Sequence, residues 1–214
     1  MLILQNITYA HPNKDLLFKN ISLTVNRQDK IALIGNNGAG KSTLLRIIAG
    51  DLQPSNGLVS TNSKPYYIPQ LFGQFNNFTI AQALQVEDKL KALHEILAGH
   101  VSEPNLALLN DDWTIEERCH KALTYWELEG FDLTRKMQSL SGGQKTKVFL
   151  AGVSIHQPEI VLLDEPSNHL DASGRELLYD FGKSALNILS HDRKLLNLLD
   201  FVYELSNMIT TFLC

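Results

Sequence analysis

Short runs of alternating hydrophobic and polar residues open the chain. Residues 2–9, LILQNITY, and residues 16–25, LLFKNISLTV, are rich in β-forming residues and are separated by the turn-prone AHPNKD. This pattern predicts an antiparallel pair of strands. The continuous apolar run KIALIG at 30–35 predicts a buried strand, and apolar residues then recur at helical spacing from Lys41 up to Gly50. A strand, a glycine-rich loop and a helix are therefore expected in succession.

The middle of the chain has helical rather than alternating spacing. Residues 79–99 and 114–130 carry the clearest helical patterns, and Thr114 with Glu117 three residues later matches a capping box. On either side of this region the pattern is mixed. It predicts strands at 58–60, 66–68, 160–164, 186–189 and 201–205, with helices through 145–155 and 174–181. The sequence thus predicts an α/β protein with a mixed sheet core, an antiparallel β subdomain and a helical insertion at about 73–140.

Composition narrows the class of protein. The 214 residues carry a formal net charge of −4, and no run of lysine or arginine indicates broad binding to nucleic acid or to an anionic membrane. Cys119 and Cys214 are too far apart for a C-x-x-C motif, so neither a disulfide framework nor a zinc site is predicted. The sequence shows no basic, apolar leader and no stretch near the roughly 20 apolar residues of a membrane span. We therefore expect a cytoplasmic protein with no membrane segment of its own.

A glycine-rich segment carries the clearest chemistry. Residues 35–42, GNNGAGKS, match the P-loop pattern G-x-x-x-x-G-K-[ST]. Its backbone N–H groups can converge on one centre, where a lysine and a helix N-terminus add positive potential. A glycine turn that happens to precede a helix is the alternative, but the flanking strand and helix favour a nucleotide phosphate site. We predict that it comprises Gly35, Asn36, Asn37, Gly38, Ala39, Gly40, Lys41, Ser42 and Thr43, with the Ser42 hydroxyl as a Mg²⁺ ligand.

A second helix end is predicted at LSGGQ, residues 140–144. Ser141 can act as the N-cap with Gln144 at position N3, and Gly142 and Gly143 leave the helix N-terminus uncovered. The segment is either another anion-binding end or simple capping.

Two adjacent carboxylates follow the apolar strand IVLLD. Asp164 and Glu165 would be costly to place beside a buried strand unless a cation or a proton transfer uses them. Asp164 fits the acid that supports Mg²⁺ in P-loop nucleotidases, and Glu165 fits a base that orients the attacking water. His191 ends a later apolar strand, NILSHDR, and is a candidate contact to the γ-phosphate.

These motifs, in this order, resemble the nucleotide-binding domain of ATP-binding cassette (ABC) proteins over nearly all of the 214 residues. The resemblance implies a single ABC ATPase domain that binds ATP and Mg²⁺. Gln70 in YYIPQ corresponds to the Q-loop glutamine, which implies a role in holding Mg²⁺ with Ser42 and Asp164. LSGGQ corresponds to the signature, SNHLD to the D-loop and His191 to the switch histidine. Tyr9 resembles the aromatic residue that stacks on adenine, although it could be an ordinary strand residue.

The D-loop resembles one branch of the family most closely. EPSNHLD is similar to the EPTNHLD of the F subfamily (ABC-F), soluble two-cassette proteins that act on ribosomes, some of which protect against antibiotics; GGQKTKVFLAG points the same way. Members of that subfamily join their cassettes by a long charged linker, whereas this sequence ends at NMITTFLC after one cassette. We therefore expect it to correspond to the N-terminal half of a longer product or to a truncated form.

The resemblance also implies a mechanism. In this family ATP lies between the P-loop of one cassette and the signature of another, so one cassette holds two half-sites. We expect ATP hydrolysis to ADP and phosphate, with Lys41, Glu165 and His191 as catalytic residues, and a second cassette as the partner, from a homodimer or a missing C-terminal half. Two alternatives are the ATPase subunit of an ABC membrane transporter and an ATP-binding module without turnover.

Overall fold

In a computed structural model the chain forms two compact units. The first, called the sheet unit, comprises Met1–Gln70, Pro158–Asn168 and Arg175–Cys214, and the second, called the helical unit, comprises Leu71–Gln157 and His169–Gly174. The structure describes residues 1–13, 15–26, 29–184, 188–190, 201–205 and 210–213.

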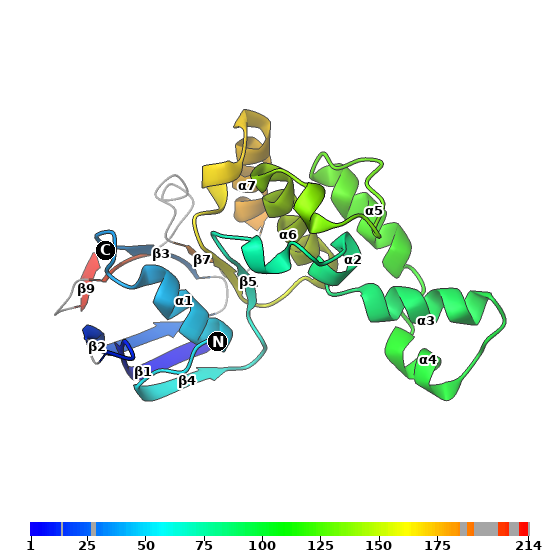
Figure 1. Cartoon of the computed structure of the whole chain (residues 1–214). Helices are drawn as coiled ribbons and strands as arrows, with labels where there is room; N and C mark the ends of the chain where they lie inside the picture. Colours follow the sequence, from blue (N-terminus) through cyan, green and yellow to red (C-terminus); the bar gives the residue numbers. More distant parts are fainter. Residues whose placement is uncertain (14, 27–28, 185–187, 191–200, 206–209, 214) are drawn as a thin grey trace. The chain divides into compact units, whose positions relative to one another are not determined.

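The sheet unit contains two sheets (Figure 1). The smaller has the strand order β2-β1-β4 and is antiparallel throughout. Its strands are β1 (Leu2–Ala10), β2 (Leu16–Val25) and β4 (Asn56–Thr61). The antiparallel subdomain predicted from the alternating N-terminal pattern is thus confirmed.

The larger sheet is mixed. Its strand order is β5-β6-β7-β3-β8-β9, and all neighbours are parallel except β8 and β9. The strands are β3 (Lys30–Ile34), β5 (Tyr66–Ile68), β6 (Val161–Leu163), β7 (Ile188–Ser190), β8 (Phe201–Leu205) and β9 (Thr210–Leu213). The predicted mixed sheet is confirmed, while β9 is a strand that the sequence pattern did not indicate.

Helix α1 (Lys41–Ala49) fills the space between the sheets. Leu44, Leu45, Ile47 and Ile48 are buried, at spacings that place them on one side of the helix, and they join side chains of both sheets in one hydrophobic cluster. The helix ends at Gly50, which adopts a left-handed conformation, as the sequence predicted. This packing fixes the start of α1 next to the end of β3.

The helical unit is built from short helices (Figure 1). They are the 3₁₀ turns η1 (Gly73–Phe75) and η2 (Met137–Ser139) and the helices α2 (Ile80–Ala83), α3 (Glu87–Leu97), α4 (Glu103–Leu109), α5 (Ile115–Tyr125) and α6 (Gly142–His156). The turn η3 (Pro166–His169) and helix α7 (Ala172–Ser184) each contain residues of both units. None of the helices that the structure describes is long and apolar enough to cross a membrane.

Two local predictions in the helical region were wrong. The expected segment 79–99 is broken between α2 and α3, where Gln85 adopts a positive φ of 59°. The expected capping box at Thr114 does not form, because its backbone (φ −100°, ψ 8°) is not extended as an N-cap requires, and Glu117 pairs with Lys121 instead. A capping box does form at Thr79 with Gln82, where ψ is 166°.

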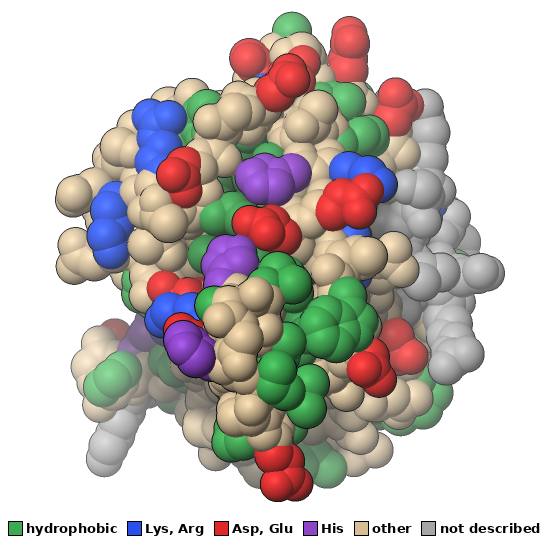
Figure 2. All heavy atoms as spheres, turned by 90° about the vertical axis from the view of Figure 1, so that its right-hand side faces the viewer, with side chains coloured by type: hydrophobic (Ala, Val, Ile, Leu, Met, Phe, Trp, Pro, Cys, Tyr) green, Lys and Arg blue, Asp and Glu red, His purple; other side chains and the backbone are tan. Residues whose placement is uncertain are grey.

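A cavity of about 550 Å³ lies within the helical unit. Figure 2 views the molecule from the side on which α3 and α4 are drawn in Figure 1, and it shows histidine and carboxylate side chains among hydrophobic ones. The three carboxylates that line the cavity have partners within the unit: Glu87 pairs with Lys91, Glu116 with His94, and Asp132 accepts bonds from Thr134. Among the described residues, no group of three or more His, Cys, Asp or Glu side chains is arranged to hold a metal ion.

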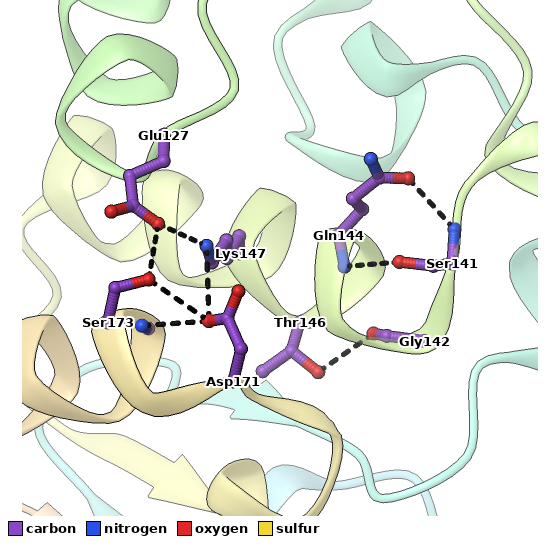
Figure 3. A network of polar contacts seen from close by, with 9 residues as sticks. Glu127, Ser141, Gly142, Gln144, Thr146, Lys147, Asp171 and Ser173 are labelled. Atoms are coloured by element: carbon purple, nitrogen blue, oxygen red, sulfur yellow. Dashed lines mark hydrogen bonds and ion pairs between the residues drawn. The ribbon is translucent and has the colours of Figure 1, made fainter.

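A buried lysine ties α6 to the start of α7 (Figure 3). The Lys147 side chain is 9% exposed, and its Nζ lies 2.5 Å from Glu127 Oε2 and 3.6 Å from Asp171 Oδ1. Ser173 Oγ, with one proton to donate, lies 3.1 Å from Glu127 Oε2 and 3.3 Å from Asp171 Oδ1, and the Gly174 N–H donates to Asp171. These contacts lower the pKa of both carboxyl groups: the bond from Lys147 acts most on Glu127, and the bond from the Gly174 N–H acts most on Asp171. Lys147 therefore holds residues 171–174 against α6.

The two threonines provide a matched test of capping. Thr79→Ala removes a side-chain acceptor that the Gln82 N–H uses, so we expect the free energy of unfolding to fall by about 1 kcal/mol. Thr114→Ala removes no such bond and should leave stability close to that of the parent. Urea unfolding followed by circular dichroism measures both. Equal losses of stability in the two variants would contradict the assignment of a side-chain cap to Thr79 and of none to Thr114.

The Lys147 network predicts a pH-dependent stability difference. Lys147→Met keeps the side-chain length but removes the cation, and we expect a loss of about 1 kcal/mol at pH 7, since both carboxylates are largely exposed to water. Because folding lowers both pKa values, this contribution is full above the ordinary values of 4.5 and 3.8 and is lost as the pH falls below them.

Urea unfolding of the parent and the variant at pH 7 and pH 3 measures how far the stability difference between them shrinks when the carboxylates become protonated. Lys121→Met serves as the control, because Lys121 forms an exposed pair with Glu117 one helical turn away. Because that pair is exposed to water, the substitution should change the free energy of unfolding little at either pH. A Lys147→Met loss that stays constant from pH 7 to pH 3, below both ordinary pKa values, would contradict a role for the two carboxylates.

Candidate nucleotide-binding site

The predicted P-loop joins β3 to α1. The Lys41 Nζ donates to the carbonyl oxygens of Gly35 (2.9 Å) and Asn36 (3.0 Å), so the ammonium group lies over the loop. Gly40, in the left-handed region, is the N-cap of α1, and the Leu44 N–H donates to its carbonyl oxygen. The first N–H groups of α1 and the lysine are thus both at the mouth of the loop, where they favour an anion.

The first glycine of the loop is required by close packing. Gly35 has a φ of 151°, and a Cβ atom at this position would lie 2.5 Å from the backbone oxygen of Leu205 in β8. No other residue fits there without moving the sheet. The sheet thus fixes where the loop begins.

Asp164 is a buried carboxylate directly after β6. It is 2% exposed, and its backbone N–H donates to the Ile68 carbonyl of β5. Its Oδ1 accepts a bond from Ser42 Oγ (3.0 Å), and its Oδ2 accepts one from Tyr67 Oη (2.9 Å). The structure therefore brings Ser42 and Asp164, two of the predicted Mg²⁺ ligands, into direct contact.

Glu165 follows in an unusual backbone conformation. Its φ is 50°, in the left-handed region that non-glycine residues seldom adopt and that occurs often at functional sites. Its Oε2 accepts bonds from Gln70 Nε2 (2.7 Å) and Asn168 Nδ2 (2.5 Å). The predicted base and the predicted Q-loop glutamine are therefore adjacent, and Asn168, from the EPSNHLD segment, is a further partner that the sequence did not indicate.

A cavity of about 450 Å³ joins these groups within the sheet unit. Its lining comprises His11, Leu17, Asn37, Gly38, Gly40, Lys41, Ser42, Thr43, Gln70 and Glu165. The P-loop and Glu165 thus open onto one space.

The cavity lining differs from the prediction at the expected adenine-stacking position. Tyr9 packs against the hydrophobic core and does not line the cavity, whereas His11, two residues later, does. The two rings are in edge-to-face contact, with centroids 5.6 Å apart. His11 is therefore a candidate contact to the adenine ring. The sequence pattern did not indicate it, because His11 lies in the segment that was predicted to be a turn. The predicted γ-phosphate contact His191 lies outside the described residues.

The signature residues cap helix α6 in the helical unit (Figure 3). Ser141 Oγ accepts the Gln144 N–H (3.2 Å), and Gln144 Oε1 accepts the Ser141 N–H (2.9 Å), which completes the capping box expected from the sequence. Close packing also favours glycine at both of the next two positions, Gly142 and Gly143, which the sequence did not show. A Cβ atom on Gly143 would lie 2.6 Å from the His169 carbonyl oxygen, and one on Gly142 would lie 3.3 Å from the His169 ring. The D-loop residue His169 therefore packs directly on the signature.

The chain matches known proteins across this whole arrangement. The sequence model of a family described as "ABC transporter" matches residues 18–168. Protein GCN20 of Saccharomyces cerevisiae is 32% identical over 200 residues, which cover 88% of this chain and 23% of that protein. The energy-coupling factor transporter ATP-binding protein EcfA2 of Methanospirillum hungatei is 33% identical, covering 91% and 47%. ABC transporter F family member 3 of Arabidopsis thaliana is 29% identical, covering 89% and 24%. The chain thus spans less than half of the length of these relatives.

A solved structure shares the fold. The ATP-binding cassette MJ0796, described as a dimeric post-hydrolysis state bound to ADP and Pi, matches with a TM-score of 0.73 and 22% identity, over 100% of this chain and 99% of that one. Together with the match to the family over residues 18–168, the P-loop, the capped signature helix and the adjacent acids Asp164 and Glu165 identify the chain as an ATP-binding cassette of the ABC family.

Proposed function

We propose that this cassette binds Mg-ATP at the P-loop and hydrolyses it when paired with a second cassette. The observation that carries the proposal is the convergence of Lys41, Ser42 and Glu165 on one cavity, with Asp164 hydrogen-bonded to Ser42 behind it. A phosphate-binding loop, a carboxylate beside its serine and a second carboxylate facing the same space are the parts that phosphoryl transfer to water requires.

The residues at the loop fit a magnesium ion. Mg²⁺ binds hard oxygen ligands, typically one or two carboxylates together with phosphate oxygens. Ser42 Oγ and Asp164 Oδ1 are 3.0 Å apart. The Gln70 amide nitrogen donates to Glu165, so the carbonyl oxygen of the same amide is left to act as a ligand to the metal. These three residues would hold the ion, which when bound supplies charge neutralisation to the phosphates.

The remaining residues act on the phosphates and on water. The Lys41 ammonium and the loop N–H groups stabilise negative charge on the transferred phosphoryl group. Glu165, held in place by Gln70 and Asn168, accepts a hydrogen bond from the attacking water and orients it. His11 lines the same cavity and is the proposed contact to the adenine ring of ATP, with the Tyr9 ring packed against it. His191 is the proposed contact to the γ-phosphate.

A second cassette completes the site. The signature helix N-terminus, capped by Ser141 and bare at Gly142 and Gly143, presents N–H groups suited to the γ-phosphate of ATP held by another cassette. The related cassette MJ0796 is described as dimeric. The second cassette is either another copy of this chain or a different cassette.

Among branches of the family, we propose the F subfamily and an action on ribosomes. The D-loop sequence SNHLD supports this branch, and an F family member of Arabidopsis thaliana is among the relatives. The competing role is that of an ATPase subunit of a membrane transporter, which is favoured by the 33% identity to EcfA2.

Binding partners distinguish the two roles. If the F subfamily assignment is right, the cassette with Glu165→Gln, expressed in its natural full-length context, should co-sediment with ribosomes in the presence of ATP. The same preparation without nucleotide is the control. Recovery in the membrane fraction with an integral membrane partner, and none with ribosomes, would instead support the transporter role.

The catalytic assignment is tested by Glu165→Gln. This change keeps the size and hydrogen-bonding capacity of the side chain but removes the carboxylate, so we expect hydrolysis to fall about 100-fold or more while ATP binding is retained. Loss of a negative charge near the γ-phosphate should also stabilise the ATP-bound pair. A phosphate-release assay and sedimentation velocity with Mg-ATP measure the two effects.

Two further variants are the controls. Lys41→Ala should lose ATP binding and therefore pairing, and Ser141→Arg should bind ATP but fail to pair, because the arginine fills the signature helix end. If Glu165→Gln hydrolyses ATP at the parental rate, Glu165 is not the base. If hydrolysis drops but no ATP-dependent pair forms with the second cassette supplied, the paired mechanism is wrong.

A further inference from the structure

The Tyr67 side chain contacts the carboxylate on which the proposed metal site depends. Tyr67 is the middle residue of β5, which lies beside β6, and its hydroxyl donates to Asp164 Oδ2 at 2.9 Å. Ser42 donates to the other oxygen, Oδ1. The carboxylate is therefore held at both oxygens by hydroxyl groups from two different elements.

The tyrosine can act only as a donor in this contact. A phenol carries its proton at neutral pH, whereas a carboxylate has no proton to donate. The Asp164 carboxylate, 2.9 Å from the hydroxyl, can therefore only accept that proton in a hydrogen bond. The interaction is of the charge-assisted kind, which is stronger and more directional than a bond between neutral groups.

We propose that Tyr67 is a positioning residue that orients the Asp164 carboxylate for divalent cation binding at the P-loop. This inference rests on the proposed function. With Oδ2 engaged by Tyr67, the plane of the carboxylate is fixed and Oδ1 stays directed at Ser42. Residues that hydrogen-bond to a metal-binding carboxylate typically change metal affinity by about 10- to 100-fold when they are replaced.

Packing alone does not explain a tyrosine at this position. The ring contacts the hydrophobic cluster of the sheet unit, and phenylalanine would make the same contact. Tyr67 is also not one of the residues that line the nucleotide cavity. Removing its hydroxyl should therefore change the orientation of Asp164 without changing the surface that ATP touches.

The test is binding of a fluorescent ATP analogue to the purified chain, titrated with Mg²⁺ and repeated in EDTA. For Tyr67→Phe we expect the Mg²⁺ concentration at half-maximal effect to rise on the order of tenfold, with affinity in EDTA unchanged. Tyr66→Phe is the matched control. It removes a buried hydroxyl from the adjacent residue, whose side chain points to the other face of β5, and should titrate like the parent.

A double-mutant cycle separates positioning from a structural effect. If Tyr67 acts through Asp164, Tyr67→Phe should cause no further change in the Mg²⁺ titration when Asp164→Asn is already present. An unchanged Mg²⁺ midpoint in Tyr67→Phe, or an equal loss of affinity with Mg²⁺ and in EDTA, would overturn the inference while leaving the proposed function intact. Failure of the parent chain to bind the ATP analogue would overturn the proposed function, and this inference with it.

Discussion

The burial of the Asp164 carboxylate is the constraint on which the nucleotide site depends. A carboxylate that is 2% exposed is costly unless several donors reach it. Its donors Ser42 and Tyr67 are 122 and 97 residues away in sequence. Meeting them requires β5, β6 and the P-loop to lie side by side, so the hydrogen bonds of one buried acid set the relative positions of three separate segments.

The neighbouring Glu165 is held in a different way. It is partly exposed, its backbone is in a left-handed conformation, and two amide groups, from Gln70 and Asn168, bind the same carboxylate oxygen. The consecutive acids Asp164 and Glu165 thus differ in burial and in hydrogen-bond partners. Asp164 faces the interior and the loop serine, whereas Glu165 is turned towards the cavity.

The helical unit shows a comparable use of a buried charge. Lys147 of α6 holds Asp171, and His169 packs on Gly143 at the start of the same helix. The D-loop residues 169–171 are therefore joined to the signature helix by an ion pair and by backbone packing.

The sequence by itself determined the elements whose chemistry is local. The P-loop, the strand before it, α1 with its glycine stop and the Ser141 capping box all depend on residues close together in the chain, and the structure has each of them. The antiparallel sheet followed from the alternation of apolar and polar positions, and the mixed sheet followed from short continuous apolar runs such as KIALIG and IVLLD. The capping pattern at Thr114 misled, because the same four residues fit a cap only if the backbone enters the helix extended, and that is set by the preceding turn.

Only the tertiary structure decided which distant side chains meet. No sequence spacing indicates that Tyr67 would bind Asp164, that His11 rather than Tyr9 would line the cavity, or that Lys147 would reach both Glu127 and Asp171. Strand order and helix packing bring these groups together across many residues, and a local pattern carries no record of those contacts. Motifs located the functional segments, whereas packing between segments selected the partners that orient them.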